Sequence, residues 1–481
     1  MTNSLPTFDS LRAINLHLAK KLKVLFFMIK QVTSIYLFGF IVIFLMGFSP
    51  VTFSQNLLEI YEFALENDPV LKQSHASQNA VGESKKQSIA NFLPNVSAVG
   101  FRNGTRLFND TNNYQGLGLQ TYTDYNIVVN LTQPIFHWEH WIQLSQADNQ
   151  IAQAEADYQA EFQKLMVKVT EAYFNVLSAE DNLEFSHSEK KAIARQLEQA
   201  KQRFEVGFIN ISESHQTQAA FDRAIATEIQ AANDLDNQKE ALTAIIGEKN
   251  FTLNNLRESI PLVKMEPDNI TAWSDVAEVA NFSVISAFNQ MEYSRKTIDI
   301  QRNGYLPKLD LVGTWGNYTT DYTYGMKGDM EIVGLRLNVP IYEGGATTSK
   351  VSQACYKFEQ AKENLIAVKR AVKHQVKNAY RGIITSISKV AALKVAVSSA
   401  EVALQSTQAG FDVGLETLVN VLNQQKNLYR DKRDYSRTRY DYLLNSIKLK
   451  QAASTLVQED LEQINQLLVA GSASRKSALF P

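Results

Sequence analysis

Cysteine, proline and glycine are all scarce in this sequence. The 481 residues contain one cysteine, Cys355, so no disulfide can form within the chain. They contain 10 prolines and 21 glycines, and neither type occurs between positions 138 and 203. Because proline and glycine are the residues that most often interrupt helices, this stretch has room for one very long helix.

An excess of charge of either sign is also missing. The chain carries 48 basic and 50 acidic side chains, which leaves a net charge of −2. Domains that bind nucleic acid usually show a clear basic excess, so we expect no nucleic-acid partner. No serine or cysteine stands in a nucleophile motif, and we assign no catalytic residue and no cofactor.

Histidine is rare, and only His137 and His140 among the seven lie close together. Histidines at this spacing can share a metal ion. Trp138 and Trp141 stand beside them, and tryptophan is enriched at membrane interfaces. We favour the interface interpretation and assign no metal ligand.

Residues 1–54 are predicted to be a signal peptide. Ile35 to Phe48 is a 14-residue run without charge, Lys30 precedes it, and small residues precede Gln55 as they do at cleavage sites. The alternative is an uncleaved membrane anchor, for which this run is short. Residues 1–27 exceed an ordinary n-region, so Met28 is a second candidate for the start of translation.

The first part of the mature chain predicts a helix followed by two strands. An apolar stripe indicates one helix over Gln55–Asn91, which Pro94 ends. Val96–Arg102 is the first strand, and residues 125–132 alternate between apolar and polar side chains like a second. We expect residues 103–124 to be a long exposed loop and Pro134 to end the strand pair.

A long helix, a tip and a shorter return helix follow. The long helix is predicted over 138–203 and would be on the order of 100 Å long. Gly207 ends it, because glycine suits the left-handed turn after a helix. The return helix covers Ile211–Ile246, and Gly247 caps it.

The same order then recurs. Phe204 and Phe411 are 207 positions apart, as are Gly207 and Gly414. The expected elements of the second half are a helix over 271–303, strands near 309–315 and 333–339, a long helix from about 351 to the tip at Gly414, a return helix to Ser454 and a short helix that ends near Ala470. We therefore predict two structural repeats, 55–261 and 262–470, and a polar tail over 471–481.

Four strands cannot close a membrane barrel, which needs about eight. Open sheet edges are not tolerated in lipid. If the strands span a membrane, several copies of the chain must complete the sheet.

Eight short motifs stand in order between Gln55 and about Ala470. They are Gln55-Asn-Leu-Leu-Glu-Ile-Tyr, Leu93-Pro94, Gln133-Pro-Ile-Phe136, Ala172-Tyr-Phe-Asn-Val-Leu177, Arg203-Phe-Glu-Val-Gly207, Leu306-Pro307, Pro340-Ile-Tyr-Glu-Gly-Gly345 and Gly410-Phe-Asp-Val-Gly414. In these motifs and their spacing, the chain resembles the TolC-like outer-membrane efflux ducts.

The resemblance implies a mainly α-helical fold with membrane β-strands. In such a homotrimer, a twelve-stranded β-barrel continues into a long α-helical coiled-coil barrel, built from two sequence repeats per chain. It also implies an exit duct of tripartite efflux or type I secretion, in the outer membrane of a Gram-negative bacterium and extending into the periplasm. The implied partners are outer-membrane lipid, a periplasmic adaptor (membrane fusion) protein and an inner-membrane pump.

The resemblance also implies which residues work at the tips. Adaptor docking falls on the two tips, at Val206, Gly207, Phe208, Val413, Gly414 and Leu415. The constriction and gate of the periplasmic mouth fall on Ser212, Glu213, Phe411, Glu416, Asn420 and Asn423.

This chain departs from the family pattern at the gate. Asn420 and Asn423 are neutral where the family places acidic residues. Phe411 has no hydroxyl to donate, and Glu416 would repel Glu213 rather than pair with it. We therefore predict a mouth held mainly by coiled-coil packing, with at most a single ring of Glu213 carrying negative charge.

One alternative of a different class is a structural coiled-coil protein held at the membrane by an uncleaved N-terminal anchor. The alternating strand pairs distinguish the two, because a scaffold has no use for them.

Overall fold

The computed structural model describes residues 55–108, 119–247, 251–321 and 327–469. All of these belong to one unit of the chain, which spans Gln55–Pro481. The predicted signal peptide over 1–54 and the tail over 471–481 lie outside the described residues.

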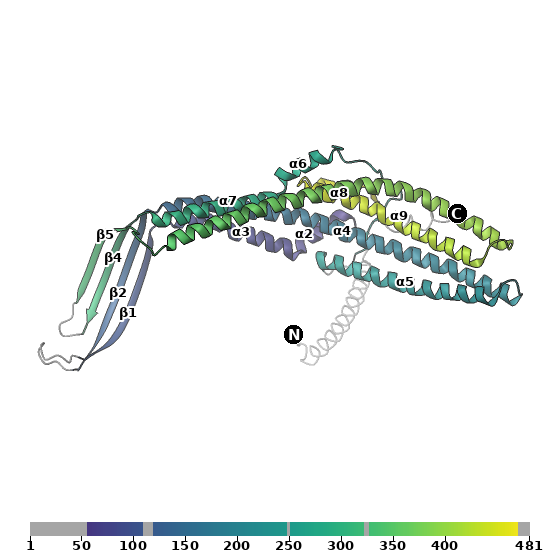
Figure 1. The fold of residues 1–481 in the computed structure, drawn as a ribbon. Coiled ribbons are helices and arrows are strands. Elements are labelled where there is room, and N and C mark those ends of the chain that lie inside the picture. Colours follow the sequence, from purple (N-terminus) through teal and green to yellow (C-terminus); the bar gives the residue numbers. More distant parts are fainter. Residues whose placement is uncertain (1–54, 109–118, 248–250, 322–326, 470–481) are drawn as a thin grey trace, which may run out of the picture. The chain divides into compact units, whose positions relative to one another are not determined.

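Two very long helices run through this unit, α4 (Trp138–Glu205) and α8 (Ala346–Asp412), with 68 and 67 residues. Each turns back into a helix of about half its length, α5 (Ile211–Ile246) after α4 and α9 (Leu418–Ala452) after α8. The two turns lie at one end of the helices, and the strands extend from the other end (Figure 1). The predicted long helices, tips and return helices are confirmed.

The predicted single helix over 55–91 is wrong, because the chain forms two helices there, α2 (Leu57–Asn67) and α3 (Pro69–Ala90). Asp68 between them is extended, since a residue that precedes proline avoids the helical region. Its carboxylate caps α3 by accepting the backbone N–H groups of Val70 and Leu71, both at 2.9 Å.

The predicted single helix over 271–303 is also divided, into α6 (Ile270–Ala280) and α7 (Phe282–Arg302), followed by the 3-10 turn η1 (Asn303–Tyr305). No proline stands at this break. Instead the side chain of Asn281 accepts the N–H groups of Ser283 and Val284, and an asparagine that caps a new helix competes with continuation of the old one.

The strands form one antiparallel sheet in the order β1-β2-β4-β5. β1 (Asn95–Phe108) and β2 (Leu119–Phe136) come from the first half, and β4 (Lys308–Thr320) and β5 (Gly328–Asn338) from the second. The halves join where β2 pairs with β4. Each strand is at least as long as the 9–11 residues that a membrane strand needs.

The predicted loop over 103–124 is wrong at both of its ends, because 103–108 and 119–124 are strand, and β1 and β2 stay paired from Asn95 opposite Thr132 to Phe108 opposite Leu119. Residues 109–118 lie outside the described part of the chain. Backbone groups make the ladder bonds, and the threonines and tyrosines of this polar stretch favour strands. Pro134 does not end the pair either. β2 continues to Phe136 with a register shift after Pro134, as expected where a residue lacks its N–H.

The two faces of the sheet differ in polarity. Leu131 lies opposite Val96 and Gly313, and Gly313 lies opposite Val333, so these positions share an apolar row. In the neighbouring row the Thr314 hydroxyl donates to Asn130 Oδ1 at 3.1 Å. Such alternation suits a sheet with lipid on one face and a polar interior on the other.

The end of the chain contains strand structure that the sequence did not predict. After α10 (Gln458–Asn465), β6 (Leu468–Val469) pairs with β3 (Asn255–Leu256) in the connection between the halves. The Tyr173 hydroxyl donates to the Asn254 carbonyl at 2.8 Å, which gives the tyrosine of the Ala172-Tyr-Phe motif a structural role. The main core packs around this region.

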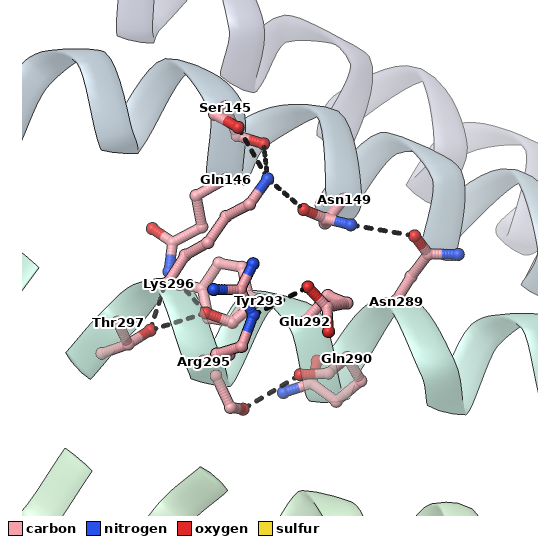
Figure 2. Close-up of polar contacts among 11 residues, drawn as sticks. Ser145, Gln146, Asn149, Asn289, Gln290, Glu292, Tyr293, Arg295, Lys296 and Thr297 are labelled. Atoms are coloured by element: carbon pink, nitrogen blue, oxygen red, sulfur yellow. Dashed lines mark hydrogen bonds and ion pairs between the residues drawn. The ribbon is translucent and has the colours of Figure 1, made fainter. Parts of the chain in front are cut away.

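Helix α7 is bound to α4 through a polar seam (Figure 2). The Lys296 ammonium donates to the carbonyl and hydroxyl of Ser145 at 2.8 and 2.6 Å and to Asn149 Oδ1 at 2.7 Å. Gln146 donates to Thr297 Oγ1 at 2.7 Å. This seam fixes the second half of the chain to the long helix of the first.

Candidate docking and gating site at the two helical tips

The first tip is a tight turn closed by backbone bonds. Gly207 adopts a φ of +79°, which side chains on a Cβ rarely permit. The Phe208 N–H then donates to the Arg203 carbonyl at 2.8 Å, as in the usual glycine cap of a helix. Asn210 starts α5 by accepting the Glu213 N–H at 2.9 Å.

The second tip repeats this geometry. Gly414 has a φ of +80°, and the Leu415 N–H donates to the Gly410 carbonyl at 2.8 Å. Thr417 starts α9, accepting the Asn420 N–H at 3.3 Å. The repeat seen in the sequence therefore extends to the backbone bonds of both turns.

Four large apolar side chains project from the tips with most of their surface exposed. Val206 and Phe208 on the first tip are 67% and 81% exposed, and Val413 and Leu415 on the second are 71% and 84% exposed. Apolar surface gathered in this way commonly marks a place where a partner binds. These are the residues that the sequence assigned to docking.

Phe411 is buried at the second tip, with 4% of its surface exposed. It packs in a small core with Ala200 of α4 and with Leu418 and Val421 of α9. Apolar contacts therefore join the two hairpins of one chain directly.

Arg203 adds a polar connection between the hairpins that the sequence analysis did not assign. Its guanidinium lies over the Phe411 ring, 4.3 Å from the centroid. It also donates to the Phe411 carbonyl at 3.2 Å and pairs with the Asp412 carboxylate at 3.1 Å. The sequence contained one indication of this ion pair, because the first tip motif includes an arginine and the second includes an aspartate.

Glu416 folds back over the end of α8. A Cβ placed on Gly410 would come within 2.9 Å of Glu416 Cγ, so the glycine makes room for this side chain. The Glu416 carboxylate accepts a bond from the Asn420 amide at 2.7 Å. The Glu416 carboxylate therefore lies beside Asn420, one of the positions expected to be neutral.

The other predicted gate residues remain on their own hairpins. Ser212 and Glu213 stand in the first turn of α5, and the Ser212 hydroxyl accepts a long bond from Gln216 at 3.5 Å. Asn423 is exposed on α9, one turn beyond Asn420. Within the described part of the chain, no hydrogen bond or ion pair joins Glu213 to Glu416 across the two tips.

The sequence and the fold both match known proteins. The sequence model of the outer membrane efflux protein family, OEP, matches residues 60–248 and 273–455. The outer membrane protein TolC of Vibrio cholerae is 36% identical over 423 residues, which cover 87% of this chain and 94% of that protein.

A more distant relative and a solved structure extend the match. The alkaline protease secretion protein AprF of Pseudomonas aeruginosa is 27% identical over 87% of this chain and 88% of its own length. The crystal structure of the Campylobacter jejuni CmeC outer membrane channel matches with a TM-score of 0.72 at 16% identity, over 86% of this chain and 90% of that one. The chain belongs to the family of TolC-like outer membrane efflux proteins.

Proposed function

We propose that three copies of this chain close one duct through the outer membrane, and that a periplasmic adaptor docks on their tips to connect it to an inner-membrane pump. As a family member, the protein is a non-enzymatic exit duct for efflux and type I secretion. It belongs to the outer membrane of Gram-negative bacteria and extends into the periplasm.

The main observation in support of a trimer is that the sheet of one chain has two open edges. β1 and β5 are the outer strands of a four-stranded sheet, and each pairs on one side only within the described residues. Three copies would join β5 of one chain to β1 of the next and give twelve strands without an edge.

The long helix α8 gives independent support for neighbouring copies. It is long and apolar enough by composition to span a membrane, but only 17% of its most apolar window is buried in the single chain. A helix of about 100 Å is far longer than the ~30 Å hydrocarbon core. Neighbouring helices of a coiled-coil barrel would cover its apolar side chains.

Pairs of cysteines at the sheet edges test the assembly. In a Cys355→Ala background, Val96→Cys on β1 is combined in turn with Val333→Cys, Leu335→Cys and Leu337→Cys on β5, which all lie on the same face of the sheet. We expect one register to give a reducible trimer band. Val129→Cys on the inner strand β2, on the same face, replaces Val96→Cys as the control, and absence of trimers at every register would contradict the proposal.

Docking is tested with a photo-crosslinking amino acid at Phe208 and at Leu415 in living cells. We expect both positions to capture the same adaptor. Val279 on α6, which is 77% exposed, is the control position. Capture at Val279 but not at the tips would place the adaptor elsewhere.

The cargo is proposed to include both small toxic molecules and secreted proteins, since AprF is named for secretion of a protease. Deletion of the gene should raise sensitivity to detergents and dyes, and reduce a secreted protein in the culture medium.

We also propose that residues 1–54 are removed on export, which leaves Gln55 first. Mass spectrometry of the purified protein should find no peptide from residues 30–50. Detection of that segment would instead favour the membrane-anchored scaffold.

A further inference from the structure

Five polar side chains meet at the corner where the sheet joins the first long helix. His137 follows the last residue of β2, and Glu139 and His140 stand in the first turn of α4. Lys308 and Asp310 reach the same corner from the beginning of β4. The corner is half-closed from solvent, with side-chain exposures of 14% for His137, 12% for Glu139 and 16% for Asp310.

His137 is held by a carboxylate on one side of its ring. Its Nε2 lies 2.8 Å from Asp310 Oδ1, so Nε2 carries the hydrogen in that bond and Nδ1 is left to bind something else. A carboxylate that fixes the far nitrogen in this way is the usual second shell of a metal-binding histidine.

One pair of the candidate donor atoms already has the spacing of metal ligands. His137 Nδ1 lies 3.4 Å from Glu139 Oε1. Two donors bonded at about 2.0–2.1 Å to a tetrahedral metal lie about 3.3 Å apart. One ligand atom from each of His137, Glu139 and His140 lies within 4.8 Å of the others.

His140 has a buried nitrogen with nothing bound to it. Its Nδ1 is out of contact with solvent and makes no hydrogen bond to the described residues. The ring stacks on His137 with centroids 4.8 Å apart, and the edge contact with Phe92 holds its other side. A buried polar atom normally has a partner, so this nitrogen points to a ligand.

We propose that His137, Glu139 and His140 bind a divalent transition-metal ion of the zinc class, with Asp310 as the second-shell partner of His137. Two imidazoles and one carboxylate suit Zn²⁺ and its first-row neighbours and suit Mg²⁺ and Ca²⁺ poorly. The ion would join the first turn of α4 to the sheet, and the proposal does not depend on the duct function.

Lys308 makes this proposal unusually testable, because its ammonium now bonds to the Glu139 carboxylate. An incoming dication would have to displace that ammonium. Removal of the lysine should therefore strengthen metal binding, whereas removal of a ligand should weaken it.

The experiment uses detergent-solubilised protein, purified without a polyhistidine tag and stripped with a chelator that is then removed. Zn²⁺ is titrated by calorimetry, and Co²⁺ is added to record the visible spectrum of a tetrahedral site. We expect one Zn²⁺ per chain, at least tenfold weaker binding in His140→Gln, 10–100-fold weaker binding in Asp310→Asn, and tighter binding in Lys308→Met.

His374→Gln is the matched control, because this exposed histidine lies on α8 and bonds to Asn378. It should leave the affinity and the Co²⁺ spectrum unchanged. Circular dichroism establishes that each variant is folded. Zinc affinity that is equal in the wild type and in His137→Gln/His140→Gln, or that Lys308→Met does not raise, overturns the proposal.

Discussion

At the scale of single residues, Arg203 is the side chain that connects the two hairpins most directly. It contacts the Phe411 ring, the Phe411 carbonyl and the Asp412 carboxylate, all on the opposite hairpin. Its side chain is 31% exposed, so each contact contributes modestly and the sum is on the order of 1 kcal/mol per chain.

We predict that Arg203→Ala loosens the tips and raises the open fraction of the mouth by at least about fivefold, the factor that corresponds to 1 kcal/mol lost in a single chain. Single-channel conductance in lipid bilayers measures this. Lys201→Ala removes the same charge two residues earlier, at an exposed position, and should behave like the wild type. Equal conductance of Arg203→Ala and Lys201→Ala would show that the tie does not hold the mouth closed.

The tip glycines give a second prediction. At Gly207 and Gly414 a Cβ would meet nothing within 4 Å, but the positive φ disfavours any branched side chain by about 1–2 kcal/mol. Gly207→Val with Gly414→Val should abolish export while trimers still form, because bulk and strain alter the docking surface.

Substitution by asparagine separates the effect of added bulk from the effect of backbone strain, since asparagine tolerates the left-handed region. If the partner must approach bare backbone, Gly207→Asn with Gly414→Asn also abolishes export; if only the cap matters, export survives. Gly82→Val in α3, where the φ is not positive, is the control. Export is followed as antibiotic susceptibility, and trimers as heat-modifiable bands on gels.

The identity of the tip residues could be predicted from the sequence, but their partners could not. The 207-residue repeat located both turns, and the missing hydroxyl of Phe411 followed from its residue type. The contacts of Arg203 with Phe411 and Asp412 depend on how one hairpin faces the other, and the bond from Asn420 to Glu416 depends on how Glu416 folds back over the end of α8. Helical spacing tells which residues share a face, and gives no register between helices 200 positions apart.

At the scale of elements, the sequence predicted the long helices closely and missed the breaks in the short ones. A 68-residue helix leaves a strong signal because nothing interrupts it. The breaks at Asp68 and Asn281 each depend on one capping side chain, which is 2% and 6% exposed respectively. A cap is a local competition whose outcome the surrounding packing decides.

Asp68 gives a prediction about pH. Burial raises the pKa of Asp68, but bonds from Lys168 and from the Leu71 and Val70 N–H groups outweigh burial, so its pKa lies below the ordinary value. A carboxyl group with a lowered pKa stabilises the fold at pH values above its unfolded pKa, about 3.9. That contribution is lost as the pH falls through the lower folded value.

We expect Asp68→Asn to reduce the free energy of unfolding by on the order of 1–2 kcal/mol at pH 7, because asparagine still caps α3 but cannot pair with Lys168. The difference from the wild type should be smaller at a pH below the unfolded pKa of about 3.9, and it should disappear as the pH falls through the lower folded value, where the wild-type carboxylate is protonated too. Thermal melts followed by circular dichroism at both pH values measure it. Asp148→Asn breaks an exposed pair with Lys85 and should change little; a deficit of Asp68→Asn that is independent of pH would contradict the linkage.

At the scale of the whole molecule, the sequence alone predicted that several copies of the chain are needed to close the sheet. The alternation of apolar and polar residues indicated four strands, which are too few to close a membrane barrel. The full extent of β1 and β2 could not be predicted, because 103–106 and 121–124 carry mostly polar residues and glycine, which are typical of a loop. The sheet is therefore longer than the apolar pattern, and its polar end would stand beyond the membrane.

The charge of the periplasmic mouth is a property of the assembled trimer. In the proposed trimer, Asn420 and Asn423 of three chains converge on one passage, being three apart on an exposed face of α9. Neutral amides bind multivalent cations weakly, and the Glu213 and Glu416 carboxylates supply the remaining negative charge.

We therefore predict weak block of single-channel current by trivalent cations added on the tip side, and weaker block still in Glu213→Gln and in Glu416→Gln. Asn420→Asp with Asn423→Asp should make block strong, because two rings of carboxylates would then face the ion, and added salt should relieve it through screening. Gln424→Glu is the control for Asn423→Asp alone: it adds the same single charge one residue further, about 100° around the helix. Strong block of the wild type that persists in Glu213→Gln with Glu416→Gln would refute this charge layout, since the current would then be blocked at carboxylates elsewhere in the duct.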